Sequence, residues 1–265
     1  MPSSWGRVAR LGLTPLKGGA HHHPESLVVS PDGPFGDRAY ALVEQHRSRG
    51  ASVVRTVENP AVLRVRPRLD GAGTLHLDVP GAGPFAVTQD TPSDGVVVAD
   101  YWGRATRLAL LPGPWDDALS RLLERPVRLV RVGTPGAVVY AEAVTLVTTS
   151  SLRELAHRAG ARTIDDERFR ATVLVDTGDG PPFAEDDLIG STVSVGEVRI
   201  EVRAPVARCA VTRLRPGTAQ READDPLRLL APDRTVGREV VFGVGAAVVR
   251  PGVLRLGDAV GSVPR

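Results

Sequence analysis

Apolar residues in the first half of the chain come in short runs that are separated by glycine, proline and aspartate. The runs lie at residues 27–29, 40–43, 62–65, 75–79, 85–87 and 96–98. Short apolar runs bounded by turn-forming residues are typical of β-strands. Residues 74–79 alternate apolar and polar side chains, which is the pattern of a strand with one face in water. The first half is therefore predicted to be rich in sheet.

A change of pattern near residue 112 indicates a domain boundary. The sequence Leu-Pro-Gly-Pro at residues 111–114 ends the succession of predicted strands. Residues 116–125 then carry leucines on one face of a predicted helix. We therefore predict two domains, residues 1–112 and residues 113–265.

The second half alternates predicted strands with a few helical segments. Strands are expected at residues 127–132, 144–147, 171–175, 192–202, 209–213, 239–249 and 253–256. Ser151-Leu152-Arg153-Glu154 has the form of a capping box that opens a helix, and Gly160 would end that helix. The pattern indicates a β-barrel or a strongly bent sheet with two or three helices. The predicted fold class is mainly β with some helix (α+β).

The charge balance argues against binding to polyanions. The chain has 33 Lys and Arg residues against 31 Asp and Glu residues, which gives a formal net charge of +2. It therefore has no excess cationic field for nucleic acid or for a membrane surface. No run of about 18 uncharged apolar residues is present, and no long apolar segment follows the charges at the N-terminus. We expect a cytoplasmic protein with no nucleic-acid or membrane partner.

Cys209 is the only cysteine of the chain and Lys17 the only lysine. One thiol excludes an intramolecular disulfide, a cysteine-rich zinc site and a self-contained iron–sulfur cluster. The guanidinium of Arg208 beside it would favour the thiolate, the form that binds soft metals or attacks electrophiles. The alternative is a buried structural cysteine. Nucleophilic catalysis would require a histidine, for which His157 is the only candidate in the same half.

Arg168 and Arg170 lie two residues apart at the entry to the predicted strand at residues 171–175, so both side chains are expected on one face. Two guanidinium groups on one face suit the bidentate capture of phosphate, and a solvated surface pair is the alternative. Ser150 and Ser151 lie at the start of a predicted helix. They could supply hydroxyl and amide donors to an anion, or simply cap the helix.

Other polar clusters have simpler interpretations. Lys17 and Asp37-Arg38 supply cationic donors in the first half, with structural salt bridges as the alternative use. His21-His22-His23 could hold a metal, although a triple histidine in a polar loop is more often solvated. Glu185-Asp186-Asp187, between prolines and a glycine, is more typical of a turn than of an acid–base pair.

A set of motifs runs through nearly the whole chain. In the first half they are Thr14-Pro15-Leu16-Lys17-Gly18, Gly36-Asp37-Arg38, and Arg55 with Pro60. In the second half they are Glu167-Arg168-Phe169-Arg170, Pro182-Phe183-Ala184-Glu185-Asp186-Asp187, Gly190, Val195-Gly196-Glu197, Arg208-Cys209 with Thr212, Pro226-Leu227, Phe242-Gly243-Val244, Pro251-Gly252 and Leu256-Gly257-Asp258. Motifs in this order resemble the MOSC family, the molybdenum-cofactor sulfurase C-terminal domain, preceded by its N-terminal β-barrel domain.

The resemblance is to the amidoxime-reducing type of this family. It implies a β-barrel-like domain at residues 1–112 and a MOSC-type β-barrel domain with flanking helices at residues 113–265. In two-domain members the pterin cofactor sits between the domains, and the family cysteine coordinates molybdenum through its sulfur. By this resemblance Cys209 is the metal ligand and the catalytic residue. The cofactor-binding residues would be Lys17, Arg38, Ser150, Ser151, Arg168, Arg170, Thr172 and Arg208.

Three positions depart from the family pattern where it supplies polar contacts. Gly18 stands where serine is usual, Thr172 where asparagine is usual, and Ala207 where a small hydroxyl is common. Each change removes or moves a hydrogen bond. The chain also has no appended ferredoxin-like module, so electrons would have to arrive from a separate donor protein of the ferredoxin or cytochrome type.

The leading hypothesis is a molybdenum-cofactor oxidoreductase that reduces N-hydroxylated or N-oxide-type small molecules, with the hard chemistry supplied by the cofactor. One alternative is a carrier that stores the cofactor, or passes sulfur to it through a persulfide on Cys209 after receiving it from a sulfur donor. A second alternative is a non-catalytic module that binds another anion between the domains.

Overall fold

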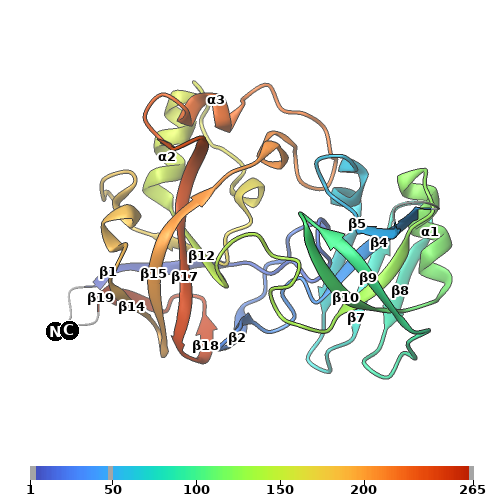
Figure 1. The fold of residues 1–265 in the computed structure, drawn as a ribbon. Coiled ribbons are helices and arrows are strands. Elements are labelled where there is room, and N and C mark those ends of the chain that lie inside the picture. Colours follow the sequence, from blue (N-terminus) through green and yellow to red (C-terminus); the bar gives the residue numbers. More distant parts are fainter. Residues whose placement is uncertain (1–3, 47–49, 263–265) are drawn as a thin grey trace.

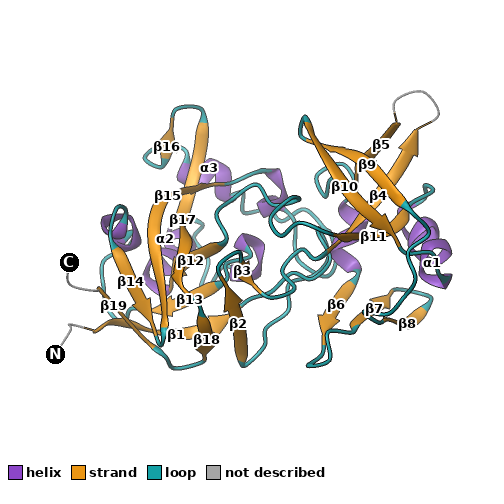
Figure 2. Ribbon diagram, turned by 60° about the horizontal axis from the view of Figure 1, so that its bottom comes forward, coloured by secondary structure: helices purple, strands orange, loops and turns teal. Residues whose placement is uncertain are grey.

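A computed structural model describes residues 4–46 and 50–262 of the chain. Strands dominate, and they form two closed barrels that lie side by side (Figure 1, Figure 2). The predicted fold class, mainly β with some helix, is confirmed. Within the described residues, no helix combines the length and the apolar character that crossing a membrane requires.

The first barrel has five strands in the order β10-β11-β4-β5-β9. They are β4 (Tyr40–His46), β5 (Gly50–Val53), β9 (Val96–Tyr101), β10 (Arg104–Leu110) and β11 (Arg128–Val132). A separate sheet packs with helix α1 (Pro114–Leu123) beside the barrel, and its strands are β6 (Arg66–Leu69), β7 (Leu75–Val79) and β8 (Gly83–Val87). Leu77 of the sheet and Leu119 of the helix are fully buried in one core, so burial of apolar surface holds the two elements together.

The second barrel has seven strands in the order β12-β13-β1-β19-β14-β15-β17, and pairing of β12 with β17 closes it. They are β1 (Ser4–Leu11), β12 (Val144–Thr148), β13 (Val173–Asp176), β14 (Thr192–Val195), β15 (Val198–Ala207), β17 (Glu239–Arg250) and β19 (Ala259–Ser262). Strand β15 shows why this part of the chain folds as a sheet. Val198, Ile200 and Val202 are buried inside the barrel, whereas Arg199 and Glu201 between them are exposed.

Short elements decorate the second barrel. Strands β2 (Ser26–Ser30), β3 (Gly33–Pro34) and β18 (Gly252–Arg255) form a small sheet, and β16 (Thr235–Val236) pairs with β17. The helices are α2 (Thr149–Arg158) and α3 (Pro226–Leu230), with 3₁₀ turns η1 (Pro60–Arg64), η2 (Asp166–Phe169), η3 (Ala184–Leu188) and η4 (Ala210–Arg213).

Most of the predicted strands are present, but two of them are wrong. Residues 62–65 belong largely to η1, because Pro60 opens a turn that buries Val62 and Leu63 in the core of the first half. Residues 209–213 are also not a strand. Strand β15 ends at Ala207, and the chain turns into η4.

The predicted capping box at Ser151 is wrong, although the helix is present. Helix α2 begins two residues earlier, and its N-cap is Thr148, whose hydroxyl accepts a hydrogen bond from the Ser151 amide at 3.2 Å. The side chain of Glu154 pairs with Arg158 one turn later instead of reaching back to the helix start. Gly160 follows the helix in a left-handed conformation with φ 62°, in agreement with its predicted role.

The predicted domain division at residue 112 stays a prediction, and strand pairing crosses it in both directions. Strand β1 lies before that residue but is a member of the second barrel. Helix α1 and strand β11 lie after it but pack within the first half of the molecule. Each barrel therefore contains at least one element from the other side of residue 112.

Candidate functional site

Cys209 follows strand β15 and is exposed. Its backbone is extended, and it precedes the 3₁₀ turn η4 as the N-cap residue. Thr212 fixes this turn, since its amide and its hydroxyl donate to the carbonyl oxygen of Cys209 at 3.1 and 3.0 Å. The thiol is thus presented to solvent by a backbone that is held in place.

Lys17 is the cation with the strongest perturbation near this cysteine. Its amide donates to the carbonyl of Tyr40 in the first barrel at 2.8 Å. Burial, with further contributions from the charges of Arg38 and Arg170, lowers the pKa of the Lys17 ammonium to about 7. Cys209 opposes this shift, so the thiol and the ammonium are close enough to interact electrostatically.

Arg38 has the left-handed conformation, with φ 48°. Its amide donates to the carbonyl of Thr14 at 2.8 Å, and its guanidinium pairs with the adjacent Asp37. Asp37 also accepts a hydrogen bond from the Thr14 amide at 3.0 Å. The segment at Thr14 and the turn at Asp37 therefore hold both the backbone and the guanidinium of Arg38 in place.

Arg170 connects the second barrel to the segment that carries Lys17. Its Nη2 donates to the carbonyls of Gly19 at 2.6 Å and Gly18 at 3.2 Å. Burial and the nearby charge of Arg38 lower the pKa of Arg170 to about 10. An unpaired cation of this kind is stabilised by any anion that approaches it.

Arg208 lies beside Cys209 and is anchored by two carbonyl groups. Nε and Nη2 donate to the carbonyl of Phe242 at 2.8 and 2.6 Å, and Nη1 donates to that of Phe169 at 2.7 Å. Burial lowers the pKa of Arg208 to about 10, with Cys209 and Glu185 acting in the opposite direction. Arg208 therefore contributes positive charge near the thiol with little freedom to reorient.

The structure thus brings together Cys209 and four predicted cofactor-binding residues, and electrostatic coupling links each cation to the cysteine or to a neighbouring cation. We call this group the thiol–cation cluster; its members are Lys17, Arg38, Arg170, Arg208 and Cys209. It joins segments from both halves of the chain.

Arg168 lies outside the thiol–cation cluster, and its predicted common face with Arg170 is wrong. Residues 166–169 form the 3₁₀ turn η2 rather than the entry of a strand, and Arg170 after it is left-handed with φ 49°. The buried Arg168 guanidinium donates instead to the carbonyl of Thr212 at 2.6 Å and to the Asp224 carboxylate at 2.6 Å. Its role is to hold the segment that follows Cys209.

Thr172 also serves the barrel. Its hydroxyl accepts from the Thr145 amide at 3.1 Å, and its amide donates to the Thr145 hydroxyl at the same distance. This reciprocal pair joins strand β12 to the residue before β13. The hydroxyl at this position, where the family has an amide, is therefore engaged inside the second barrel.

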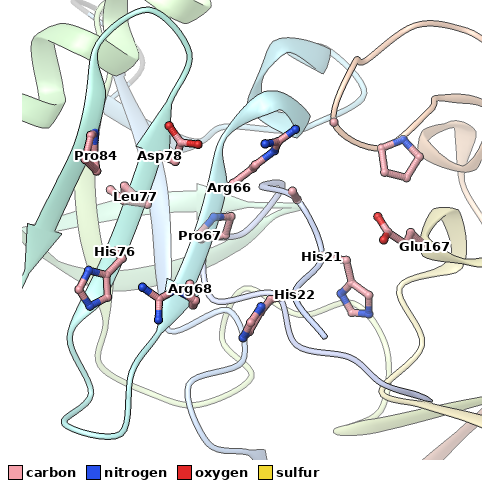
Figure 3. Close-up of a pocket in the computed structure, with 13 residues that line it drawn as sticks. His21, His22, Arg66, Pro67, Arg68, His76, Leu77, Asp78, Pro84 and Glu167 are labelled. Atoms are coloured by element: carbon pink, nitrogen blue, oxygen red, sulfur yellow. The ribbon is translucent and has the colours of Figure 1, made fainter. Parts of the chain in front are cut away.

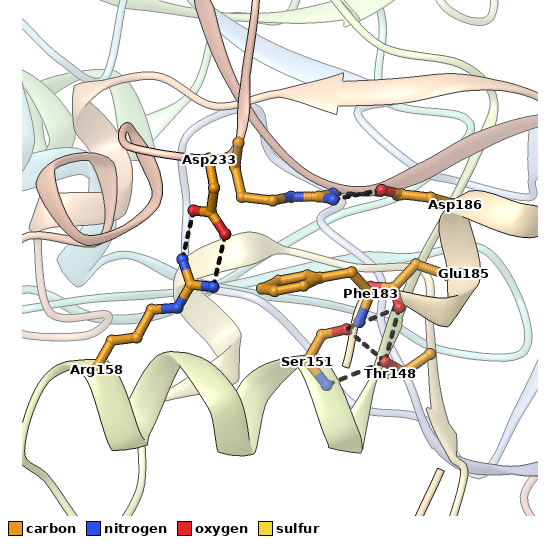
Figure 4. Close-up of polar contacts among 8 residues, drawn as sticks. Thr148, Ser151, Arg158, Phe183, Glu185, Asp186 and Asp233 are labelled. Carbon is orange, nitrogen blue, oxygen red and sulfur yellow. Dashed lines mark hydrogen bonds and ion pairs between the residues drawn. The ribbon is translucent and has the colours of Figure 1, made fainter. Parts of the chain in front are cut away.

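Ser150 and Ser151 are both buried, and Figure 4 shows Ser151 beside Thr148 and Glu185. The Ser151 hydroxyl donates to Oε2 of Glu185 at 2.7 Å, and the Thr148 hydroxyl donates to the same oxygen at 2.9 Å. The Ser150 hydroxyl accepts from Thr177 at 3.0 Å. Burial raises the pKa of the Glu185 carboxyl, and its Oε1 has no hydrogen-bond partner. Ser151 and Thr148 thus satisfy one oxygen of a buried carboxyl group.

The same region contains a stacked arrangement of charged and aromatic side chains (Figure 4). The guanidinium of Arg158 lies 5.2 Å from the centre of the Phe183 ring and pairs with Asp233 through two hydrogen bonds of 2.6 and 2.8 Å. The guanidinium of Arg234 lies 4.3 Å from the same ring centre and pairs with Asp186. Asp186 therefore takes part in an ion pair.

The histidine triplet is not simply solvated. His21 is buried, with Nδ1 2.8 Å from the Thr14 hydroxyl and Nε2 3.1 Å from the carbonyl of Ala171. Burial, together with the charges of Arg170 and Arg38, lowers its pKa well below the ordinary value. His23 contacts Glu167 at 2.9 Å. Among residues 4–46 and 50–262, no three His, Cys, Asp or Glu side chains form a group that could hold a metal ion.

Tyr101 is a residue of this region that the sequence patterns did not single out. It ends strand β9 and its side chain is buried. The centre of its ring lies 4.6 Å from the Lys17 ammonium and 5.1 Å from the Arg104 guanidinium. Burial raises the pKa of the Tyr101 hydroxyl. The aromatic pair Tyr101-Trp102 before Gly103 was the one available signal.

Two cavities lie near the cluster without including Cys209. One, of about 550 Å³, lies between the β6–β7 sheet and the second barrel, and Figure 3 shows its lining. The other, of about 600 Å³, lies beside α2 and α3 and includes Arg158, Arg168 and Asp224. Neither of these two cavities includes the exposed thiol.

Comparison with known proteins gives one family match. The family model of the MOSC domain matches residues 130–261. Among curated proteins, none matches the sequence significantly.

Comparison with solved structures gives several matches. The YuaD protein from Bacillus subtilis is 13% identical, with a TM-score of 0.44, and the match covers 98% of this chain and 97% of that one. YiiM from Geobacillus stearothermophilus is 18% identical with a TM-score of 0.34, and YiiM from Escherichia coli is 16% identical with a TM-score of 0.35. Each YiiM match covers 47% of this chain, and 55% and 56% of the respective YiiM chains.

Proposed function

Because the chain belongs to the MOSC domain family, which is associated with the molybdenum cofactor, we propose that it binds a molybdenum–pterin cofactor. We further propose that it is an oxidoreductase that reduces N-hydroxylated or N-oxide-type small molecules. Electrons would come from a separate ferredoxin- or cytochrome-type protein. The thiol–cation cluster is the observation that carries this proposal.

The cluster has the donor types that such a cofactor requires. The exposed Cys209 supplies one soft sulfur ligand to a metal. The cofactor's phosphate is an anion that ammonium and guanidinium groups bind well, and Lys17, Arg38 and Arg170 offer such groups. Two of these cations, Lys17 and Arg170, have lowered pKa values because they are buried without enough negative charge nearby. A bound anion would supply that charge.

Each residue of the cluster has a separate task in this proposal. When bound, the cofactor supplies two-electron reduction of an N–O bond. Arg170, held by the carbonyls of Gly18 and Gly19, would orient the anion between the halves of the chain. Lys17 would take up a proton as the anion binds, since its pKa of about 7 lies below that of an ordinary lysine. Arg208 would hold positive charge beside the Cys209 sulfur.

The exposure of Cys209 also favours a second candidate, a carrier that passes sulfur to the cofactor through a persulfide. A thiol that exchanges sulfur with a partner protein must be accessible, and Cys209 is. Persulfide on Cys209 with transfer to an acceptor enzyme would support the carrier, whereas a stable metal–sulfur bond with turnover would exclude it. A protein purified without pterin or molybdenum from a cofactor-replete host would instead support a non-catalytic anion-binding module.

The deciding experiment is the molybdenum and pterin content of the protein purified from a host that makes the cofactor. We expect about one molybdenum per chain in the parent and its loss in Cys209→Ser, because a hydroxyl is a poor ligand for a soft metal. Ala210→Ser, which adds a hydroxyl one residue away and keeps the thiol, is the control and should stay loaded. Equal loading of Cys209→Ser, or an empty parent, would refute the cofactor proposal.

A further inference from the structure

The cavity between the β6–β7 sheet and the second barrel has the features of a separate anion site. It has a volume of about 550 Å³ and includes Arg66 and Arg68 from the sheet. Figure 3 shows these arginines on the sheet side, and His21 and Glu167 on the opposite side. Cys209 does not line the cavity, so it is distinct from the metal end of the thiol–cation cluster.

Arg66 and Arg68 present two guanidinium groups on one face of β6. They alternate with the buried Pro67, and both are exposed. Within residues 4–46 and 50–262, neither side chain forms an ion pair or a hydrogen bond. Arginines so placed in a concave surface have all their donors available, and the planar fork matches carboxylate and phosphate oxygens.

Neither acidic residue of the lining forms an ion pair with Arg66 or Arg68. Glu167 is engaged by His23 at 2.9 Å, and this contact lowers the pKa of the Glu167 carboxyl. The other carboxylate of the lining belongs to Asp78. Asp78 lies opposite Arg66 in the register of strands β6 and β7. The lining therefore offers two guanidinium groups that are not engaged by its two carboxylates.

His22 adds a neutral donor. Its backbone is fixed by two hydrogen bonds with Leu13, at 2.7 and 2.8 Å, while its half-buried ring lies between Arg68 and His21 in Figure 3. Burial, with the charges of His23 and Arg68, lowers the pKa of the His22 ring, so the ring is neutral at neutral pH. A neutral imidazole has one N–H group, which can donate a hydrogen bond to an oxyanion.

We propose that this cavity binds a small organic molecule with an oxyanion group, a carboxylate or a phosphate, held by Arg66 and Arg68 with His22 as a further donor. The volume exceeds that of a single inorganic oxyanion, and Pro67, Pro84 and Pro216 provide apolar contacts for an organic body. The site does not depend on the proposed cofactor function, because its lining shares no residue with the thiol–cation cluster.

The test is calorimetric titration of the full chain with inorganic phosphate and, separately, with succinate. The Arg66→Ser/Arg68→Ser variant should bind at least about tenfold more weakly, since two charge-assisted contacts are lost. The matched control is Arg107→Ser/Arg199→Ser, which removes two exposed arginines without ion pairs from other strands and should bind as the parent does. The anion that binds more tightly identifies the oxyanion class.

The remaining outcomes overturn the proposal. These are equal affinity in the Arg66→Ser/Arg68→Ser variant, equal weakening in the control, or no saturable binding of either anion to the parent. Loss of binding in Lys17→Met but not in the double variant would assign the anion to the thiol–cation cluster instead. Circular dichroism of each variant establishes that it is folded.

Discussion

The ammonium nitrogen of Lys17 lies 4.6 Å from the centre of the Tyr101 ring. The face of an aromatic ring attracts a cation, but here that attraction does not offset burial among other positive charges, and the pKa of Lys17 falls to about 7. The only lysine of the chain therefore lies where its charged form is costly. A residue in such a place is stabilised as soon as an anion arrives.

Replacement of Lys17 by methionine should stabilise the isolated protein. Below pH 7 both the folded and the unfolded protein carry the ammonium, so the full cost of burying it is present. Between pH 7 and the ordinary value of 10.5 only the unfolded state keeps the proton, and the stability of the parent rises with pH. We expect Lys17→Met to gain up to about 4 kcal/mol at pH 6 and progressively less toward pH 10.

Urea unfolding at a series of pH values measures this difference. Arg107→Met, which removes an exposed cation of strand β10, is the control and should give a difference that does not vary over the same range. A Lys17→Met advantage that is constant with pH would show that the ammonium is not titrating near pH 7. The same variant should bind phosphate-containing ligands of the cluster more weakly, so stability and binding would change in opposite directions.

The buried carboxyl of Glu185 should make the stability of the protein fall as pH rises, which is opposite to the effect of Lys17. Because burial raises the pKa of its carboxyl, the folded state keeps a proton above pH 4.5 that the unfolded state has lost. The parent therefore loses stability as pH rises from the ordinary value of 4.5 to the raised one. Glu185→Gln preserves an acceptor for Ser151 and Thr148 and removes the charge, so its stability should fall less over that range. A pH series of thermal unfolding is the measurement.

The matched control for Glu185→Gln is Glu239→Gln, because Glu239 is an exposed acidic residue of strand β17 in the same half of the chain. That variant should keep the slope of the parent. Should Glu185→Gln show the same slope as well, the buried carboxyl would not be the group responsible.

Much of the fold could be predicted from sequence, because more and less buried residues alternate along strand β7 and along residues 198–203 of strand β15. The two failures share a physical cause. Short apolar runs at residues 62–65 and 209–213 have the composition of strands, but Pro60 and the Thr212 hydroxyl turn the backbone into 3₁₀ geometry. The place of β1 in the second barrel, between β13 and β19, was also out of reach, since pairing between distant segments leaves no local pattern.

The candidate site also contains residues that the sequence marks and residues that only the structure shows. Lys17, Arg38, Arg170 and Cys209 could be named because motifs mark them, and the electrostatic coupling between them agrees with one location. Arg168 could not be separated from Arg170, because the left-handed backbone that turns the two side chains apart is visible only in three dimensions. Tyr101 was missed since a buried aromatic at a strand end is ordinary core composition.

Close packing around Gly12 joins the first half of the chain to the second, and a substitution there should lower the stability of the protein. Its amide donates to the carbonyl of Thr172 at 2.9 Å, and a Cβ atom placed on it would lie 2.0 Å from Nε2 of His21 and 2.3 Å from the carbonyl of Ala171. Gly12→Ala must therefore break the His21 contact, at a cost of about 2–4 kcal/mol. Gly71→Ala, where a Cβ meets nothing within 4 Å, is the control for chemical denaturation and should be close to neutral. Equal stability of the two variants would contradict the close packing at Gly12.

Gly18 stands where the family usually has serine. We infer that the backbone and the packing at this position require glycine. Its φ is 85°, and an added Cβ would lie 2.6 Å from the Thr56 hydroxyl and 2.9 Å from a methyl group of Val62. Restoring the family residue with Gly18→Ser should therefore cost about 2–4 kcal/mol, from left-handed strain and from overpacking. It should also weaken the hold of the Gly18 carbonyl on Arg170 and raise the salt sensitivity of anion binding at the cluster.

Gly81→Ser separates the two causes of that cost. Gly81 has nearly the same backbone angle, φ 78°, but a Cβ there meets nothing within 4 Å. It should lose only the conformational part, about 1 kcal/mol, so the difference between the two variants in urea unfolding measures the clash with Thr56 and Val62. If Gly18→Ser were as stable as Gly81→Ser, the loop could relax around a side chain at residue 18. Glycine would then not be required by packing, and the family serine would be compatible with this fold.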